Sequence, residues 1–127
     1  MNHVIPISSK RYLLEIYLLQ EAHGYASISG IAKVLRVNVS AASKMAGNLK
    51  TDSYIHFQRY GTVTLTKAGL EIGKKLFQDH QVLMEFYQII GVEEKLIRKK
   101  VSEVEMIIGT EVVFKIKSFI EDHKKNA

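Results

Sequence analysis

The chain has 127 residues, of which 46% are hydrophobic and 24% are charged, and it contains no cysteine. This composition is typical of a soluble globular protein with one core or two small cores, and it excludes disulfides and thiolate metal sites. Because no apolar run is long enough to span a bilayer and the first residues lack a signal-peptide pattern, we expect a cytoplasmic protein with no membrane partner.

The positive charge is concentrated in the first half of the chain. Residues 1–66 contain seven Lys or Arg and three Asp or Glu, a net charge of +4, whereas residues 67–127 contain eleven and ten, a net charge of +1. Such an excess favours binding of nucleic-acid phosphates by the first half. An ordinary charged surface is the alternative interpretation of the same numbers.

Three helices are predicted in this half. Apolar residues are dense from Lys10 to Ala22, and Gly24 follows at a position typical of a helix C-terminus. Ser27 is placed to cap a second helix, and Asn38 is placed to cap a third. The third helix is expected to bury the side chains of Val39, Ala42, Met45, Ala46 and Leu49.

The other face of this third helix carries small and polar side chains. Outward or nearly outward positions are expected for Ser40, Ala41, Ser43, Lys44 and Gly47. These side chains are short enough for a close approach to base edges in a DNA major groove. Gly47 weakens a helix interior by about 1 kcal/mol relative to Ala, which hints at a close backbone approach.

A β-hairpin is predicted after the third helix. Apolar and polar residues alternate between Tyr54 and Leu65, on either side of Tyr60-Gly61. A short helix followed by such a hairpin is the layout of a winged helix-turn-helix, which inserts the helix into the major groove of double-stranded DNA. The candidate DNA-binding residues are Arg36, Asn38, Ser40, Ala41, Ser43, Lys44, Lys50, Arg59 and Tyr60. We expect the basic residues to contact phosphates rather than bases.

The second half of the chain is predicted to be all helical. Thr66 is expected to cap a long helix that reaches Ile90 and is closed by Gly91, followed by helices over about 93–108 and 110–122 and a frayed tail. The fold class is therefore mostly α with a small β-hairpin. Residues 1–66 form a winged helix-turn-helix domain and residues 67–127 a helical dimerisation domain, whose apolar surface suggests a homodimer on a palindromic site.

Ordered motifs along most of the chain resemble one known family. They are Ile16-Tyr17, Gly24-Tyr25-Ala26, Ser43-Lys44-Met45, Leu65 to Gly69, Ile72-Gly73-Lys74, His80 and Ile89 to Val92. Together they are similar to the manganese transport regulators of the diphtheria toxin repressor family. The resemblance implies a homodimeric transcriptional repressor with an N-terminal winged helix and a helical dimerisation domain.

The same resemblance implies that the family's metal site is largely lost. Family members bind manganese through two carboxylates of the first helix, a histidine of the long helix, and a Glu, Glu, His set of the next helix. The corresponding residues in this chain are Arg11, Leu14, His80, Ser102, Glu105 and Met106. Only His80 and Glu105 keep a ligand-type side chain, so we expect no metal and no other cofactor, with manganese or another divalent cation as the alternative.

The substitutions have a physical interpretation of their own. Glu105 lies on an apolar helical stripe, and a buried carboxylate without a partner costs several kcal/mol. Arg11 carries a permanent positive charge that is able to make bidentate contacts. We therefore hypothesise that Arg11 pairs with Glu105 and acts as an internal cation, so that DNA binding does not require manganese.

Three alternatives stay open at this stage. A rebuilt effector site, with Asp79, Glu103 or Glu15 beside His80, would make the protein responsive to another metal or to a small molecule. A winged helix is also used for protein contacts in some proteins. An enzyme is the weakest reading, because no nucleophile with a base, glycine-rich phosphate loop or carboxylate pair is recognisable.

Overall fold

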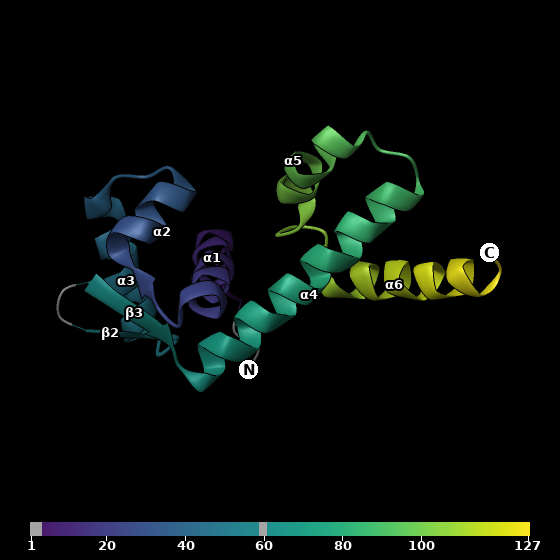
Figure 1. Cartoon of the computed structure of the whole chain (residues 1–127). Helices are drawn as coiled ribbons and strands as arrows, with labels where there is room; N and C mark the ends of the chain where they lie inside the picture. Colours follow the sequence, from purple (N-terminus) through teal and green to yellow (C-terminus); the bar gives the residue numbers. More distant parts are fainter. Residues whose placement is uncertain (1–3, 59–60) are drawn as a thin grey trace. The chain divides into compact units, whose positions relative to one another are not determined.

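The computed structural model describes residues 4–58 and 61–127 (Figure 1). Within these ranges the chain forms six helices and three short strands. In chain order they are α1 (Ile7–His23), β1 (Ala26–Ser27), α2 (Ile28–Leu35), α3 (Val39–Thr51), β2 (Ile55–Phe57), β3 (Thr62–Leu65), α4 (Lys67–Ile89), α5 (Glu94–Val104) and α6 (Thr110–Lys125). Among the residues described, no helix combines the length and the apolar character needed to cross a membrane.

The chain divides into two compact units. The first unit is Met1–Lys75 and the second is Leu76–Ala127, so the division falls inside α4. The mostly helical fold class and its winged helix-turn-helix are confirmed by this element order.

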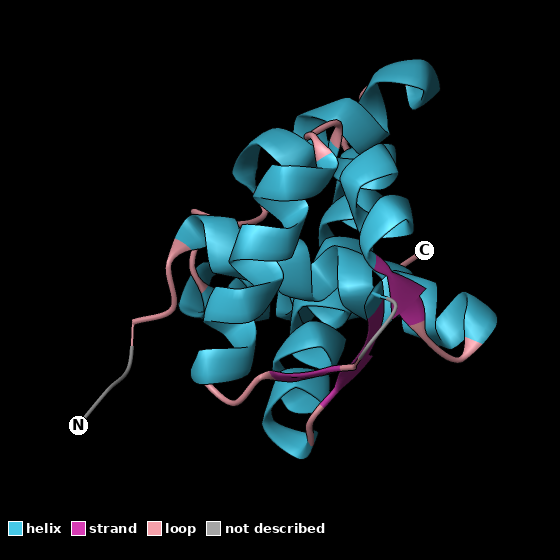
Figure 2. Cartoon of the chain, turned by 90° about the vertical axis from the view of Figure 1, so that its left-hand side faces the viewer, coloured by secondary structure: helices cyan, strands magenta, loops and turns pink. Residues whose placement is uncertain are grey.

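The sheet of the first unit has one strand more than the sequence predicts. The strand order is β1-β3-β2, and both pairs are antiparallel. Figure 2 shows the strands in magenta. The predicted hairpin is present as β2 and β3, with Ile55 opposite Leu65. The strand β1 is only two residues long and pairs Ala26 with Val63. Because pairing of such a short strand depends on a distant segment, local sequence patterns do not reveal it.

Side-chain caps fix the starts of α2, α3 and α4, as the sequence predicts. Ser27 Oγ accepts a hydrogen bond from the backbone N–H of Gly30 at 2.9 Å, and Asn38 Oδ1 accepts one from Ala41 N–H at 2.7 Å. At the start of α4, Thr66 Oγ1 accepts a hydrogen bond from Gly69 N–H at 3.1 Å and donates to the carbonyl oxygen of Ser53 at 2.7 Å. These bonds satisfy N–H groups that a helix leaves without intrahelical partners.

The core of the first unit is made by one face of each helix and of the sheet. Its fully or almost fully buried side chains are Leu13, Ile16, Ile31, Ala32, Ala42, Ala46, Leu49, Ile55 and Val63. Two glycines let the start of α4 approach this core closely. A Cβ atom at Gly73 would lie 2.7 Å from Cβ of Tyr17, and one at Gly69 would overlap the carbonyl oxygen of Tyr54.

The second unit has a small core of its own. Leu83, Ile97 and Val101 are buried at its centre, with partly buried residues of α4, α5 and α6 packed around them. Phe86 of α4 and Phe119 of α6 meet edge to face with ring centroids 6.0 Å apart, a preferred aromatic geometry. An ion pair of 2.7 Å joins Lys124 Nζ to Glu85 Oε2, which fixes the end of α6 on α4.

Several predicted helix bounds are wrong. Helix α1 begins at Ile7 rather than Lys10, because Pro6 accepts the first intrahelical bond from Lys10 N–H. Helix α5 ends at Val104, since a tight turn follows in which Ile107 and Ile108 both donate to the Val104 carbonyl. Helix α6 continues to Lys125, so the first two of the four residues in the expected frayed tail, 124–127, are helical.

Candidate nucleic-acid interface and metal position

The turn between α2 and α3 sets the direction of the third helix. Arg36 has a left-handed backbone conformation (φ 58°), and Val37 N–H donates to the carbonyl of Ala32. This closure ends α2, and Asn38 then caps the new helix three residues later. Arg36 therefore has a backbone role in addition to its exposed charge, and the side-chain oxygen of Asn38 is used inside the turn.

The outward face of α3 largely matches the prediction. Ser40, Ala41, Ser43 and Lys44 are exposed, and Gly47 is half-buried. Ala42, Ala46 and Leu49 are buried as expected. The prediction for Val39 is wrong: this side chain is expected to face the core, but it is 56% exposed. Val39 is the first residue of α3, so no preceding turn of the helix lies under its side chain.

Gly47 does not mark a close contact within the protein. A Cβ atom built at this position would have no described neighbour within 4 Å. The space that glycine leaves on α3 is therefore open to the surroundings. The packing of this unit gives no structural reason for glycine at this point.

The wing is fastened to α1 by a side chain. Gln20 Oε1 accepts a hydrogen bond of 2.8 Å from the backbone N–H of Leu65 in β3. The strand β1 pairs only with the first half of β3, so Gln20 supplies a partner beyond the end of that short strand. The predicted wing-tip residues Arg59 and Tyr60 lie outside the described residues.

A groove runs between the C-terminal end of α3 and the edge strand β2. Its volume is about 590 Å³, and it is lined by Lys50, Ser53, Ile55, His56, Phe57, Gln58 and Thr66. The lining contains one ammonium group and no carboxylate, which suits a neighbouring phosphate. Lys50 is one of the DNA-binding residues predicted from the sequence, whereas His56 and Gln58 are not among them. Their alternation with Ile55 and Phe57 was the available signal, since both polar residues are exposed.

In the second unit, the two remaining ligand-type residues bind each other. His80 Nδ1 lies 2.6 Å from Glu105 Oε1, a short hydrogen bond from the ring N–H to the carboxylate. The Glu105 side chain is 4% exposed and that of His80 is 22% exposed. The Phe77 ring stacks beside His80 with centroids 6.2 Å apart. Glu105 thus has a partner within its own unit, which the sequence analysis did not assign.

The residues present do not fit the family's manganese site. Two positions that would supply oxygen or nitrogen ligands hold buried hydrocarbon and thioether side chains, Leu14 and Met106. Manganese prefers carboxylate, carbonyl and imidazole ligands, and a thioether suits softer metals. Across residues 4–58 and 61–127 no group of three or more His, Asp or Glu is placed to hold a metal ion.

Comparisons with known proteins agree with this architecture. The family "Iron dependent repressor, N-terminal DNA binding domain" matches residues 8–63. The HTH-type transcriptional regulator MntR of Shouchella clausii (strain KSM-K16) is 36% identical over 119 residues, which is 94% of this chain and 83% of that protein.

Solved structures are similar in fold at lower sequence identity. A manganese-dependent transcriptional repressor in complex with manganese has a TM-score of 0.81 and 21% identity, over 89% of this chain and 52% of that chain. The hypothetical protein SSo2273 from Sulfolobus solfataricus has a TM-score of 0.68 and 21% identity, over 91% and 89% of the two chains. The chain thus spans about half the length of the first of these structures.

A capped and exposed α3, followed by a β-wing on a basic unit, defines a winged-helix DNA-binding protein. The extent of the match to the MntR relative identifies the family. The chain belongs to the metal-dependent transcriptional repressors of the diphtheria toxin repressor type, as its sequence motifs predict. It is a DNA-binding transcriptional regulator of the manganese-regulator type.

Proposed function

We propose that this repressor binds its operator as a homodimer and does so without manganese. The DNA-binding surface is the exposed face of α3, with Ser40, Ala41, Ser43 and Lys44, together with Arg36, Asn38 and Lys50. From the sequence alone, we add Arg59 and Tyr60, which lie outside the described residues. The observation that carries the metal proposal is the 2.6 Å bond that joins His80 to Glu105. The homodimer rests on the apolar surface of the second unit.

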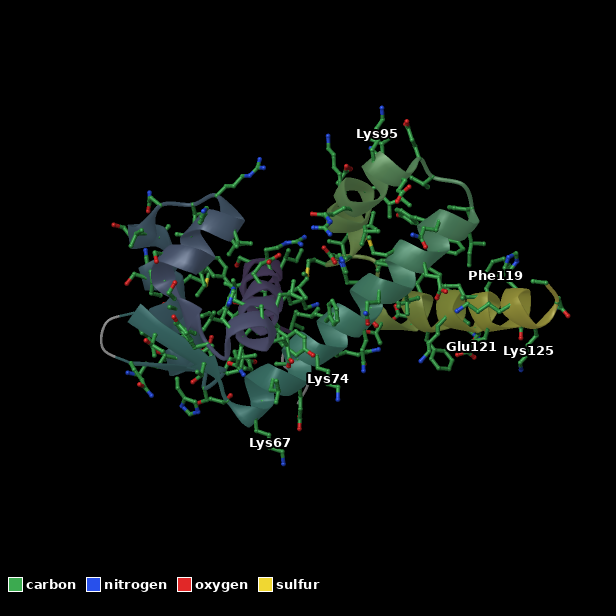
Figure 3. All side chains as sticks on the ribbon, viewed as in Figure 1. Lys67, Lys74, Lys95, Phe119, Glu121 and Lys125 are labelled. Atoms are coloured by element: carbon green, nitrogen blue, oxygen red, sulfur yellow. The ribbon has the colours of Figure 1, made fainter. Side chains whose placement is uncertain are left out.

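The second unit exposes several large hydrophobic side chains. Its exposed hydrophobic side chains are Ile90, Leu96, Ile107, Val112, Phe114 and Phe119, of which Ile107 is 66% and Phe114 64% exposed. Figure 3 labels Phe119 on α6. Exposed apolar groups in this number are typical of a protein interface. A second copy of the chain is the partner that a palindromic operator requires.

The homodimer is tested by light scattering after size-exclusion chromatography. Phe114→Glu places a charge on the proposed interface, and we expect it to shift the protein from twice the chain mass toward the monomer mass and to weaken operator binding. Val4→Glu, at an exposed position of the first unit, serves as the matched control. A wild-type protein that is monomeric at all concentrations would contradict the proposal.

Metal independence is supported by the donor chemistry at the six family positions. One imidazole and one carboxylate remain, and they satisfy each other at 2.6 Å. A metal ion would have to break this bond, and the side chains of Leu14 and Met106 offer no oxygen or nitrogen ligand in its place. A site with so few oxygen and nitrogen donors is poor for a hard divalent cation.

The direct test is operator affinity in the presence of a chelator and of excess manganese. We expect the two dissociation constants to agree within a factor of about three. A change of tenfold or more, which corresponds to about 1.4 kcal/mol, would show that manganese still regulates the protein. The MntR relative from Shouchella clausii is a suitable comparison protein in the same assay.

The positive charge of Arg11 is the second element of the proposal, and it rests on the sequence. Arg11 lies in α1 and is half-buried. A guanidinium keeps its charge at all relevant pH values, as a bound cation does. We expect Arg11→Leu to weaken operator binding and Arg11→Lys to retain most of it, measured with chelator present. Equal affinity of wild type and Arg11→Leu would remove Arg11 from the account.

One observation favours regulation by a small molecule as a second candidate function. A cavity of about 430 Å³ lies beside His80 and is lined by Phe77, Gln81, Met84, Glu85 and Gln88. All of its lining residues belong to α4, so it is walled from one side only. A thermal-shift screen with polar metabolites tests this candidate, and a ligand whose effect is lost in Gln81→Ala would support it.

A further inference from the structure

Val39 is an unusual residue for the first position of an exposed helix. It follows the cap residue Asn38 directly, and its side chain is 56% exposed. The other exposed residues in the first half of α3 are Ser40, Ala41, Ser43 and Lys44, none of which has a branched apolar side chain. More than half of this branched hydrocarbon is open to the surroundings rather than packed in the core of its own unit.

The backbone around Val39 holds this side chain in a defined direction. Asn38 Oδ1 accepts the Ala41 N–H at 2.7 Å, and Ala42 N–H donates to the Asn38 carbonyl at 3.1 Å. The first turn of α3 is therefore fixed on both sides of Val39. A β-branched side chain in a helix also strongly prefers a single rotamer, so the two methyl groups are presented in a narrow range of positions.

The chemistry of the major groove offers a partner for such a group. Recognition helices of helix-turn-helix proteins contact base edges with their N-terminal residues. Only thymine presents a methyl group in the major groove, and apolar side chains recognise it by contact. Building on the DNA-binding surface proposed above, we infer that Val39 determines operator specificity by packing its methyl groups against the C5-methyl of a thymine in each half-site.

This inference is tested on a duplex selected by the wild-type protein from a random-sequence pool, with chelator present. Each thymine of the half-sites is replaced by deoxyuridine, which removes the C5-methyl group and keeps the base pairing. At one thymine, we expect the replacement to weaken wild-type binding by about threefold to tenfold. In Val39→Ala the same replacement should change affinity by less than a factor of about two.

Val34→Ala is the matched control, because Val34 is 46% exposed and lies on α2. It should keep the wild-type ratio between thymine and deoxyuridine at every position. Val39→Ile restores a branched side chain and should restore sensitivity to the methyl group. Since Val39 is exposed, thermal unfolding of the three variants should match that of the wild type and exclude a folding defect.

Two results would overturn the inference. In the first, every deoxyuridine replacement that weakens binding of the wild type weakens binding of Val39→Ala equally. In the second, the selected half-sites contain no thymine. Both leave the proposed homodimer and its metal independence untouched. Selection of a site without two-fold symmetry, or selection that succeeds only with manganese, would instead contradict the proposed function.

Discussion

The two units of this chain differ in what they have kept of their family. The first unit has the helix caps, the exposed α3 and the β-wing of a DNA-binding repressor. The second unit has the helices, and in it His80 and Glu105, the two ligand-type residues that the resemblance implies, are hydrogen-bonded to each other. We infer that the helical fold depends on apolar spacing, whereas metal binding would depend on a few polar side chains.

The largest expected effect tests how tightly the first unit holds the start of α4. A Cβ atom at Gly69 would overlap the Tyr54 carbonyl oxygen, so we expect Gly69→Ala to lower the free energy of unfolding by about 3 kcal/mol. Urea denaturation with linear extrapolation measures the change. A loss of less than about 1 kcal/mol would mean that this contact relaxes easily.

Gly47→Ala is the matched control for that variant. The same methyl group is added within a helix, but at Gly47 it meets open space. We expect unfolding free energy to rise by about 1 kcal/mol, because alanine is the better helix former. If operator affinity falls at the same time, the open space beside Gly47 is used by the DNA.

The hydrogen bond between His80 and Glu105 is expected to stabilise the second unit. His80→Ala removes the hydrogen-bond partner of a Glu105 side chain that is only 4% exposed, and we expect a loss of about 2 kcal/mol. Glu105→Gln keeps an acceptor oxygen for the ring N–H and should lose less. If both variants unfold like the wild type, the pair has no structural role and the comparison between the units is weakened.

The Asn38 cap is expected to stabilise the start of α3 in the first unit. Asn38→Ala removes the cap that accepts Ala41 N–H at 2.7 Å, with an expected loss of about 1 kcal/mol. Asn38→Asp keeps an acceptor oxygen and should retain most of the stability. Thermal unfolding of the three proteins decides between a structural cap and a residue with no role in stability.

The smallest expected effect separates phosphate contacts from decorative charges. Lys50 is exposed and lines the groove between α3 and β2, so Lys50→Ala should reduce the slope of log affinity against log salt by about one unit. Lys95, whose side chain extends from α5 in Figure 3 and pairs with Glu93, is the control. An unchanged slope for Lys50→Ala would remove the groove from the DNA interface.

The parts of the fold that were predictable are those encoded by neighbouring residues. Ser27, Asn38 and Thr66 act as caps within three residues of their partners, and the alternation around Gly61 gives the hairpin. The strand β1 was not predictable, because two residues form a strand only when β3 lies beside them. The end of α5 at Val104 was not predictable either, because it depends on backbone hydrogen bonds in the following turn that local sequence patterns do not reveal.

The candidate site was predictable only in part, for the same reason. The small outward residues of α3 follow from helical spacing, but Val39 does not, because the first residue of a helix has no preceding turn to pack against. The need of Glu105 for a partner follows from its apolar stripe. That His80 is such a partner does not, since 25 residues separate the two in sequence and only the packing of α4 with α5 joins them.

The most direct test of the difference between the two units is isothermal titration calorimetry. Manganese is titrated into the wild-type protein and into His80→Ala as the reference. The account predicts no saturable heat of manganese binding for either protein. The MntR relative from Shouchella clausii is titrated at the same concentrations for comparison. Saturable binding to the wild type that His80→Ala abolishes would contradict this account, because a metal ion would then occupy the place assigned to the His80–Glu105 bond.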